Sequence, residues 1–218
     1  LNSGLTFRVE NGAIRFGLSA VKGISYEFLK RIVEARKSAI PQWKDIFELD
    51  ASLSAQYFSR KQIEPLIKSG ALDEFHQDRS TLLATLDAAV KYAELVRPKM
   101  EVDLFEGDFN SFGKPKYIVK EPLPDMMKLQ FERETLGFYM SSHPIGRWKE
   151  TLNQPFIDLQ NLGNKKNGEH VFVLGMIEEI RRIRTKKGES MAFVTLQDES
   201  GEASCTIFPN DYAKINLI

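Results

Sequence analysis

The stretch Leu18-Ser19-Ala20-Val21-Lys22-Gly23-Ile24-Ser25 sets the fold of the first half of this chain. Apolar residues at helical spacing follow it, beginning with Phe28 and continuing through Ile32, which predicts a helix directly after Ser25. Glycine populates positive φ without a steric penalty, so Gly23 predicts a tight turn before that helix. Serine readily accepts a hydrogen bond from the first amides of a helix, so Ser25 is expected to cap it.

This stretch resembles a helix-hairpin-helix, in which a tight glycine turn joins two helices. In that motif the free N–H groups at the start of the second helix point outward and bind a DNA phosphate without reading sequence. The candidate duplex DNA phosphate-binding residues are Lys22, Gly23, Ile24 and Ser25. Gly23 permits close approach, Ile24 fills the space between the helices, and Lys22 adds a charge-assisted contact. Ser25 replaces the usual second glycine, and the alternative is an ordinary helical turn.

Upstream of this stretch the sequence predicts a β-hairpin. Asn11-Gly12 separates two alternating runs, and both residues tolerate the positive φ of a type I′ turn. Downstream, helical spacing continues to about Arg97, and Pro98 is expected to end the last helix. A second turn, at Gly70, fits a helix C-cap better than a second phosphate-binding hairpin. Residues 1–97 are therefore predicted to be a β-hairpin plus a helical helix-hairpin-helix region.

Residues 98–125 are rich in turn formers and are predicted to be an exposed linker. The linker contains Glu101-Val102-Asp103-Leu104-Phe105, and two adjacent large apolar residues in a linker are costly unless a partner covers them. The segment resembles the Gln-x-x-Leu-Phe type of peptide that binds a sliding clamp, with Glu101 in place of the glutamine and Leu104 and Phe105 as anchors. The alternative is that both anchors fold back onto their own domain.

Residues 126–169 are predicted to be a helical connector, with a helix from Met126 to Met140. Residues 170–218 carry three β-rich runs separated by turns, which predicts a three-stranded meander. Basic and aromatic residues on such a meander suit single-stranded DNA. The candidate single-stranded DNA-binding residues are Arg182, Arg184, Lys186, Lys187 and Phe193. The alternative is a solvated basic hairpin.

Composition limits the classes of function. The 218 residues include 30 Lys and Arg against 30 Asp and Glu, so any polyanion must be bound by a local patch and not by bulk charge. The hydrophobic fraction of 42% and the charged fraction of 28% are typical of a soluble globular protein and not of a membrane-embedded one. The single cysteine, Cys205, can form no intramolecular disulfide, and no signal segment opens the chain, so we expect the cytoplasm.

The sequence predicts neither catalytic nor metal-binding residues. It contains no Asp-x-Asp pair for two-metal phosphoryl transfer, no Gly-Lys-Ser/Thr phosphate loop and no Gly-x-Ser-x-Gly elbow. The three histidines lie far apart and have no ligand partners at metal spacing, although convergence in space stays open.

The order of motifs along the chain points to a family. In sequence the motifs are Ile14 to Leu18, Lys22-Gly23-Ile24, Leu66 to Asp73, Glu132 to Ile145, and Thr185 to Gly201. This order resembles the C-terminal half of the bacterial DNA polymerase III alpha subunit, a C-family replicative DNA polymerase. The block Leu136-Gly137-Phe138-Tyr139-Met140-Ser141-Ser142-His143-Pro144-Ile145 is the most specific part of the resemblance.

The resemblance implies an α+β fragment with a helix-hairpin-helix region, an internal clamp-binding peptide and a truncated OB-fold. Its implied partners are duplex and single-stranded DNA, a sliding clamp and other replisome subunits, in the bacterial cytoplasm and with no membrane. The parent resembles a DNA-directed DNA polymerase, a nucleotidyltransferase, whose metal-binding aspartates would lie upstream. We therefore expect no catalytic site and no cofactor in this fragment, with Mg²⁺ only in the absent catalytic domain. The alternative function is a connector module that joins replisome proteins without binding DNA.

Overall fold

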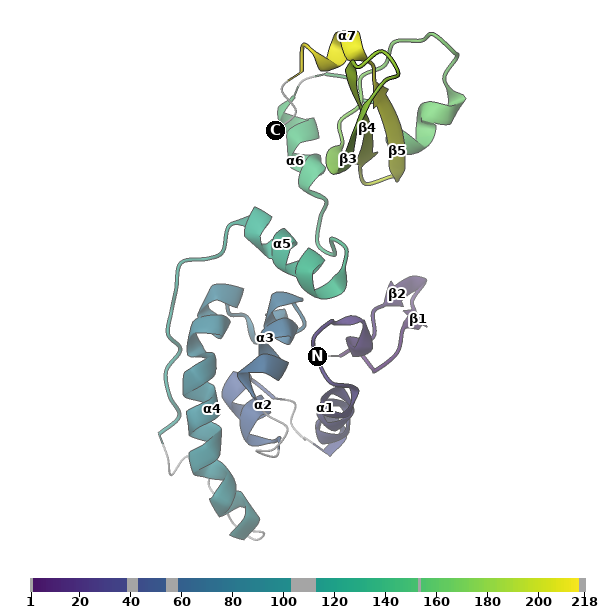
Figure 1. Ribbon diagram of the computed structural model, residues 1–218. Coiled ribbons are helices and arrows are strands. Elements are labelled where there is room, and N and C mark those ends of the chain that lie inside the picture. Colours follow the sequence, from purple (N-terminus) through teal and green to yellow (C-terminus); the bar gives the residue numbers. More distant parts are fainter. Residues whose placement is uncertain (1, 39–42, 54–58, 103–112, 153, 216–218) are drawn as a thin grey trace. The chain divides into compact units, whose positions relative to one another are not determined.

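The computed structural model describes residues 2–38, 43–53, 59–102, 113–152 and 154–215, with residues 38, 97–102 and 147 described by their backbone alone (Figure 1). The chain divides into two compact units, which we call the N-terminal unit (Leu1–Met140) and the C-terminal unit (Ser141–Ile218). The predicted segment boundaries at residues 97, 125 and 169 do not coincide with this division, because elements on both sides of residues 97 and 125 pack together. The combination of helices with antiparallel strands confirms the predicted α+β class.

The predicted N-terminal hairpin is present. Strand β1 (Arg8–Glu10) pairs antiparallel with β2 (Ala13–Arg15), and Val9 lies opposite Ile14. Asn11 has a φ of 52° and Gly12 a φ of 77°, as a type I′ turn requires. A short 3-10 helix, η1 (Leu18–Ala20), follows the hairpin and leads into the bend at Gly23.

Four helices form the core of the N-terminal unit: α1 (Tyr26–Ser38), α2 (Ile46–Ala51), α3 (Arg60–Lys68) and α4 (Arg79–Val102). A 3-10 turn, η2 (Asp73–Phe75), lies between α3 and α4. The helices pack on one another through fully buried side chains, including Phe28, Leu29, Ile32, Phe47, Ile63, Leu66, Leu72, Leu82 and Leu86. Each such side chain contributes about 1.5–3 kcal/mol to the free energy of unfolding.

The prediction that Pro98 ends the last helix is wrong, because α4 passes through Pro98 and ends at Val102. The segment after the gap, residues 113–124, is largely exposed, as predicted for a linker, but it is hydrogen-bonded to α4, and we call it the strap. Thr85 Oγ1 accepts a hydrogen bond from the amide of Ile118 at 2.9 Å, and Thr81 Oγ1 accepts one from the amide of Lys120 at 3.0 Å. Alternate amides of an extended chain point the same way, so this spacing fastens the strap along α4.

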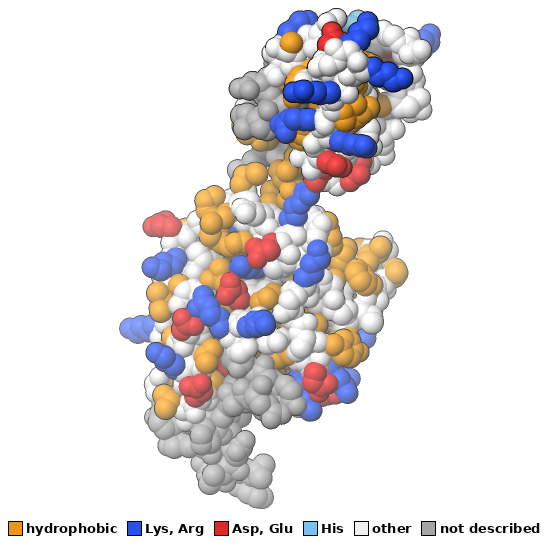
Figure 2. Space-filling model, in the orientation of Figure 1, with side chains coloured by type: hydrophobic (Ala, Val, Ile, Leu, Met, Phe, Trp, Pro, Cys, Tyr) orange, Lys and Arg blue, Asp and Glu red, His pale blue; other side chains and the backbone are white. Residues whose placement is uncertain are grey.

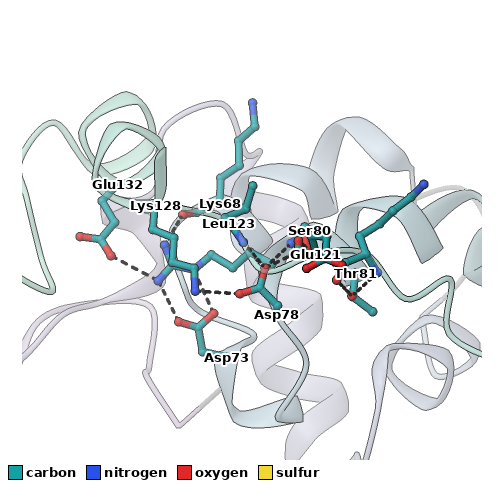
Figure 3. A network of polar contacts seen from close by, with 11 residues as sticks. Lys68, Asp73, Asp78, Ser80, Thr81, Glu121, Leu123, Lys128 and Glu132 are labelled. Atoms are coloured by element: carbon teal, nitrogen blue, oxygen red, sulfur yellow. Dashed lines mark hydrogen bonds and ion pairs between the residues drawn. The ribbon is translucent and has the colours of Figure 1, made fainter. Parts of the chain in front are cut away.

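Asp78 joins three elements at the start of α4. Its Oδ1 accepts hydrogen bonds from the amides of Ser80 and Leu123, and its Oδ2 lies 2.7 Å from the Lys128 ammonium of helix α5 (Asp125–Leu136) (Figure 3). Burial opposes ionisation of this carboxyl, but the hydrogen bonds from Lys128, Ser80 and Leu123 outweigh it and hold the pKa of Asp78 well below its usual value.

Arg79 anchors α5 to the turn between α3 and α4 through Asp73 and Glu132, which Figure 3 labels. Its guanidinium makes two hydrogen bonds to the Asp73 carboxylate, at 3.0 and 2.8 Å, and one to Glu132 of α5 at 3.2 Å. The Glu132 side chain is only 1% exposed, and its second oxygen accepts a hydrogen bond from the amide of Met140 at 2.8 Å. Helix α5 ends at Leu136, before the predicted Met140, because Gly137 adopts a φ of 91° as its C-cap.

The C-terminal unit contains the predicted three-stranded meander. Strand β4 (Ser190–Gln197) pairs antiparallel with β3 (Met176–Arg184) on one side and with β5 (Glu202–Ile207) on the other. The first strand was predicted from His170 but begins at Met176, and Pro209 opens the short helix α7 (Pro209–Tyr212). Within the described part of this unit the three strands do not close into a barrel, so an OB-fold stays a prediction.

His143 caps helix α6 (Pro144–Thr151) of the C-terminal unit. Its Nδ1 accepts a hydrogen bond from the amide of Ile145 at 3.3 Å, and Pro144 occupies the first position of the helix, where its missing N–H has no cost. Burial lowers the pKa of His143, and the carboxylates of Glu199 and Asp198 partly oppose that shift. The neutral ring that this favours is the form that can accept the capping hydrogen bond.

We predict that Arg79→Leu lowers the free energy of unfolding by about 3 kcal/mol, because it leaves the carboxylate of Glu132 buried without its charge partner. The matched control is Arg60→Leu, since Arg60 forms an exposed ion pair with Asp87 at 2.8 Å and such pairs contribute about 0–1 kcal/mol. Urea denaturation of the two variants and the wild type measures both values. Equal losses for the two variants would contradict the assigned role of Arg79.

Candidate functional site

The bend at Gly23 is open to solvent. Gly23 has a φ of 83°, and it is exposed together with Lys22 and Ser25. Among the described residues, a Cβ added at Gly23 would meet only Pro65, at 3.8 Å. Ile24 is partly buried against the core of the helices, as the predicted plug between them. A ligand can therefore approach the backbone of this bend closely.

The amides around Gly23 divide into bonded and free ones. The amide of Lys22 donates to the carbonyl oxygen of Thr135 at 2.7 Å, and that of Ser25 donates to Gln62 Oε1 at 2.9 Å. Ser25 Oγ accepts from the amide of Phe28 at 3.3 Å, which confirms Ser25 as the cap of α1. The amides of Gly23 and Ile24 find no acceptor within the described part of the chain. Two adjacent donors at the start of a 13-residue helix are thus left unbonded.

The turn at Gly70 has a similar φ of 80° but is closed. Its own amides are bonded, because Gly70 donates to the carbonyl of Ile67 at 3.0 Å and Ala71 to that of Leu66 at 3.0 Å, as in a Schellman C-cap. A Cβ at Gly70 would collide with the Arg79 guanidinium. Gly70 therefore has the geometry of a helix C-cap, which is the role that the sequence favoured for it.

Charge near the open bend comes mainly from Lys22. Its side chain is exposed, and no ion pair to it occurs among the residues that the structure describes. On the face of the N-terminal unit seen in Figure 2, basic and acidic side chains alternate without a patch of one sign. With a formal net charge of zero, any attraction of the bend for an anion must come from local donors.

The strand register of the C-terminal unit separates the predicted single-stranded DNA-binding residues. Phe193 of β4 lies directly opposite Arg181 of β3 and Thr206 of β5, and Phe193 is 40% exposed. Side chains alternate between the faces of a strand, so Arg182 and Arg184 lie on the other face. Of the predicted candidates on the strands, Arg182 and Arg184 therefore do not share a face with Phe193, and their role in binding stays a prediction.

Lys186 and Lys187 are exposed at the turn between β3 and β4. Gly188 gives this turn its positive φ of 85°. On the visible face of the C-terminal unit, Figure 2 shows several basic side chains around hydrophobic ones. Arg181, which the sequence reasoning did not single out, is the cation nearest in register to the exposed ring of Phe193.

The candidate clamp-binding segment falls mostly outside the described residues. Glu101 lies in the last turn of α4, while Leu104 and Phe105 belong to the stretch that the structure leaves undescribed. The described residues contain no group of three His, Cys, Asp or Glu placed to hold a metal ion. None of the described helices is long and apolar enough to span a membrane.

Sequence reasoning missed the two long-range contacts of the bend. Gln62 and Thr135 lie 37 and 113 residues from their partners Ser25 and Lys22. Neither contact leaves a local pattern in the sequence. The one sequence signal related to these contacts was Gly137, because a glycine directly after a predicted helix indicates where that helix ends.

Comparisons with known proteins agree with this geometry. A sequence model of the helix-hairpin-helix motif matches residues 1–82. The chain is 38% identical, over 99% of its length, to the DNA polymerase III subunit alpha of Bacillus subtilis (strain 168), and 37% identical over 97% to that of Halalkalibacterium halodurans. The corresponding Staphylococcus aureus (strain MRSA252) protein is 34% identical over 95% of the chain.

The chain spans about a fifth of the length of these relatives, between 18% and 19%. The similarity nevertheless runs through both units, since it covers between 95% and 99% of the chain. The predicted resemblance is therefore confirmed: the chain is a relative of one segment of the bacterial DNA polymerase III alpha subunits.

Proposed function

We propose that the N-terminal unit binds duplex DNA through its phosphate backbone, without sequence preference, at the bend formed by Lys22, Gly23, Ile24 and Ser25. The observation that carries this proposal is the pair of amides at Gly23 and Ile24, which have no acceptor among the residues that the structure describes and lie at the open bend before α1. Free N–H groups and the positive end of the helix dipole both favour a phosphate there. The Lys22 ammonium adds a cation beside them.

The proposed contact is local, so it supplies few phosphate contacts. A chain with equal numbers of acidic and basic residues has no long-range field to add to them. We therefore place this segment as one DNA-holding part of a bacterial, cytoplasmic replicative polymerase. DNA synthesis with Mg²⁺ belongs, in this proposal, to other parts of the whole subunit, and the segment itself takes no cofactor.

A second proposal concerns the C-terminal unit and single-stranded DNA. Arg181, Phe193 and Thr206 lie side by side across β3, β4 and β5. An exposed ring can stack on a base while the adjacent cation contacts the backbone. Lys186 and Lys187 at the hairpin turn extend the positive charge along a bound strand. Arg182 and Arg184 contribute only from the opposite face.

The third proposal is docking of a sliding clamp by residues 101–105, with Leu104 and Phe105 as apolar anchors and Glu101 at the position of the usual glutamine. The support for it is the sequence pattern and its place after α4. The competing function is a connector that joins replisome subunits without binding DNA. The equal numbers of acidic and basic residues support it. Binding of oligonucleotides at low salt separates the connector from the DNA-binding proposals.

For duplex binding we predict that log affinity falls linearly with log salt, with a slope that corresponds to a few phosphates. Lys22→Ala should reduce the magnitude of that slope by about one and weaken binding equally for duplexes of different sequence. The matched control is Lys91→Ala, at an exposed lysine of α4. Fluorescence anisotropy measures all three proteins. Affinity that does not change with salt would argue against phosphate contacts and in favour of the connector.

For single-stranded DNA we predict that Phe193→Ala weakens binding by roughly 1–3 kcal/mol through loss of stacking. Arg181→Ala should reduce the magnitude of the salt slope by about 0.7, the value for one phosphate of a single strand. Phe172→Ala is the control, because Phe172 is an exposed phenylalanine outside the three strands. Equal losses for Phe172→Ala and Phe193→Ala would rule out a specific stacking position.

For clamp docking we predict that Leu104→Ala combined with Phe105→Ala abolishes capture of the sliding clamp from the same organism. Each buried anchor contributes about 1.5–3 kcal/mol, so losing both removes most of the binding free energy of a short peptide. The control is Phe109→Ala with Phe112→Ala, in the same stretch of sequence. Pull-down with purified clamp tests both double variants, and unchanged capture by the Leu104 and Phe105 variant would refute the assignment.

A further inference from the structure

We infer that the end of α5, from Thr135 to Gly137, positions Lys22 for phosphate binding, an inference that rests on the duplex DNA binding proposed above. The first observation is the hydrogen bond from the amide of Lys22 to the carbonyl oxygen of Thr135, at 2.7 Å. On the other side of the bend, the amide of Ser25 is bonded to Gln62 of α3. The two free amides, of Gly23 and Ile24, are therefore held from both sides by other helices.

Gly137 provides the second observation. A Cβ added there would lie 2.8 Å from Lys22 Nζ and 3.4 Å from Lys22 Cε, so the lysine side chain runs directly over this glycine. The lysine ammonium thus sits at the C-terminal end of α5, where the helix dipole favours a cation. A Cβ at position 137 would therefore force the ammonium, the free end of a flexible side chain, to move from this place. Gly137 suits this position for its φ of 91° and also because it leaves the ammonium where it is.

The end of α5, which carries Gly137, is itself held in place by contacts within the N-terminal unit. Thr135 is 4% exposed, and Leu136 packs against the core of the N-terminal unit. The ion pair between Arg79 and Glu132 holds the preceding turn of α5, and the ring of Phe138 lies 5.0 Å from that of Phe16. A lysine side chain normally loses rotational freedom when it binds an anion. Resting Lys22 on a fixed surface reduces that loss, because part of the ordering is present before the phosphate arrives.

Gly137 and Thr135 are positioning residues in this account, since they act on the phosphate only through Lys22. The discriminating variant is Gly137→Asn, because asparagine is the side chain best tolerated in the left-handed conformation and still displaces the ammonium. We expect it to weaken duplex DNA binding about threefold to tenfold at low salt, as for loss of one hydrogen bond. We expect the salt slope to fall in magnitude by about one, as for Lys22→Ala.

A double-mutant cycle separates positioning from general strain. With Lys22→Ala already present, Gly137→Asn has no ammonium to displace, so it should not weaken DNA binding further. Thermal unfolding of the same four proteins should show that Lys22→Ala recovers part of the stability lost in Gly137→Asn. Gly12→Asn is the control, because Gly12 has a similar φ of 77° in the same unit and nothing among the described residues lies within 4 Å of an added Cβ.

Each outcome gives a definite answer. Wild-type DNA affinity in Gly137→Asn, or losses of affinity from Lys22→Ala and Gly137→Asn that add in the double variant, would overturn the inference and leave the proposed DNA binding intact. A wild-type chain that binds no duplex DNA at low salt would refute the proposed function and the inference together. If Gly137→Asn unfolds, Gly137→Ala in the Lys22→Ala background still tests the contact, because only a direct clash predicts that the second substitution restores folding.

Discussion

The buried ion pair between Arg79 and Glu132 is the interaction on which the geometry of the N-terminal unit depends. A carboxylate that is 1% exposed is tolerated only when a cation and hydrogen-bond donors replace its water, and Arg79 and the amide of Met140 fill those roles. The pair fixes α5 against the turn between α3 and α4. The carbonyl oxygen of Thr135, at the end of α5, is therefore in place to accept the hydrogen bond from the amide of Lys22. A charge pair inside the unit thus determines the conformation of a bend on its surface.

Two glycine turns with nearly the same φ differ in whether their backbone N–H groups are already bonded. At Gly70 the amides are bonded within the turn and the Arg79 side chain covers the backbone. At Gly23 the flanking amides have partners in other helices, and the two between them have none within the described residues. Positive φ is common to both turns, so it cannot be the deciding feature. The deciding feature is whether the N–H groups are already satisfied.

Sequence patterns predicted the elements that are determined by residues close together in the chain. The hairpin follows from Asn11-Gly12, the start of α1 from Ser25, and the meander from alternating residues between turns. The strap was missed because its stability comes from Thr81 and Thr85, whose hydroxyls meet residues more than 30 positions away. The partners of Lys22 and Ser25 were missed for the same reason. Pro98 misled because a proline disfavours a helix locally, and the backbone of α4 nevertheless continues through it to Val102.

The face assigned to Arg181 follows from the register of the hairpin and not from the pattern of apolar residues. Ile177, Ile180 and Ile183 are spaced by three, so in a regular strand they cannot all lie on one face. Between the turn and Glu179 the pairing is regular, which places Arg181 opposite Phe193, and Ile180 opposite the buried Val194 on the other face. A bulge between Ile177 and Glu179 then changes the phase and puts Ile177, opposite Leu196, on the same face as Ile180. Sequence alone shows the isoleucines but neither the register nor the bulge, so it could not show which arginine shares the face of the ring.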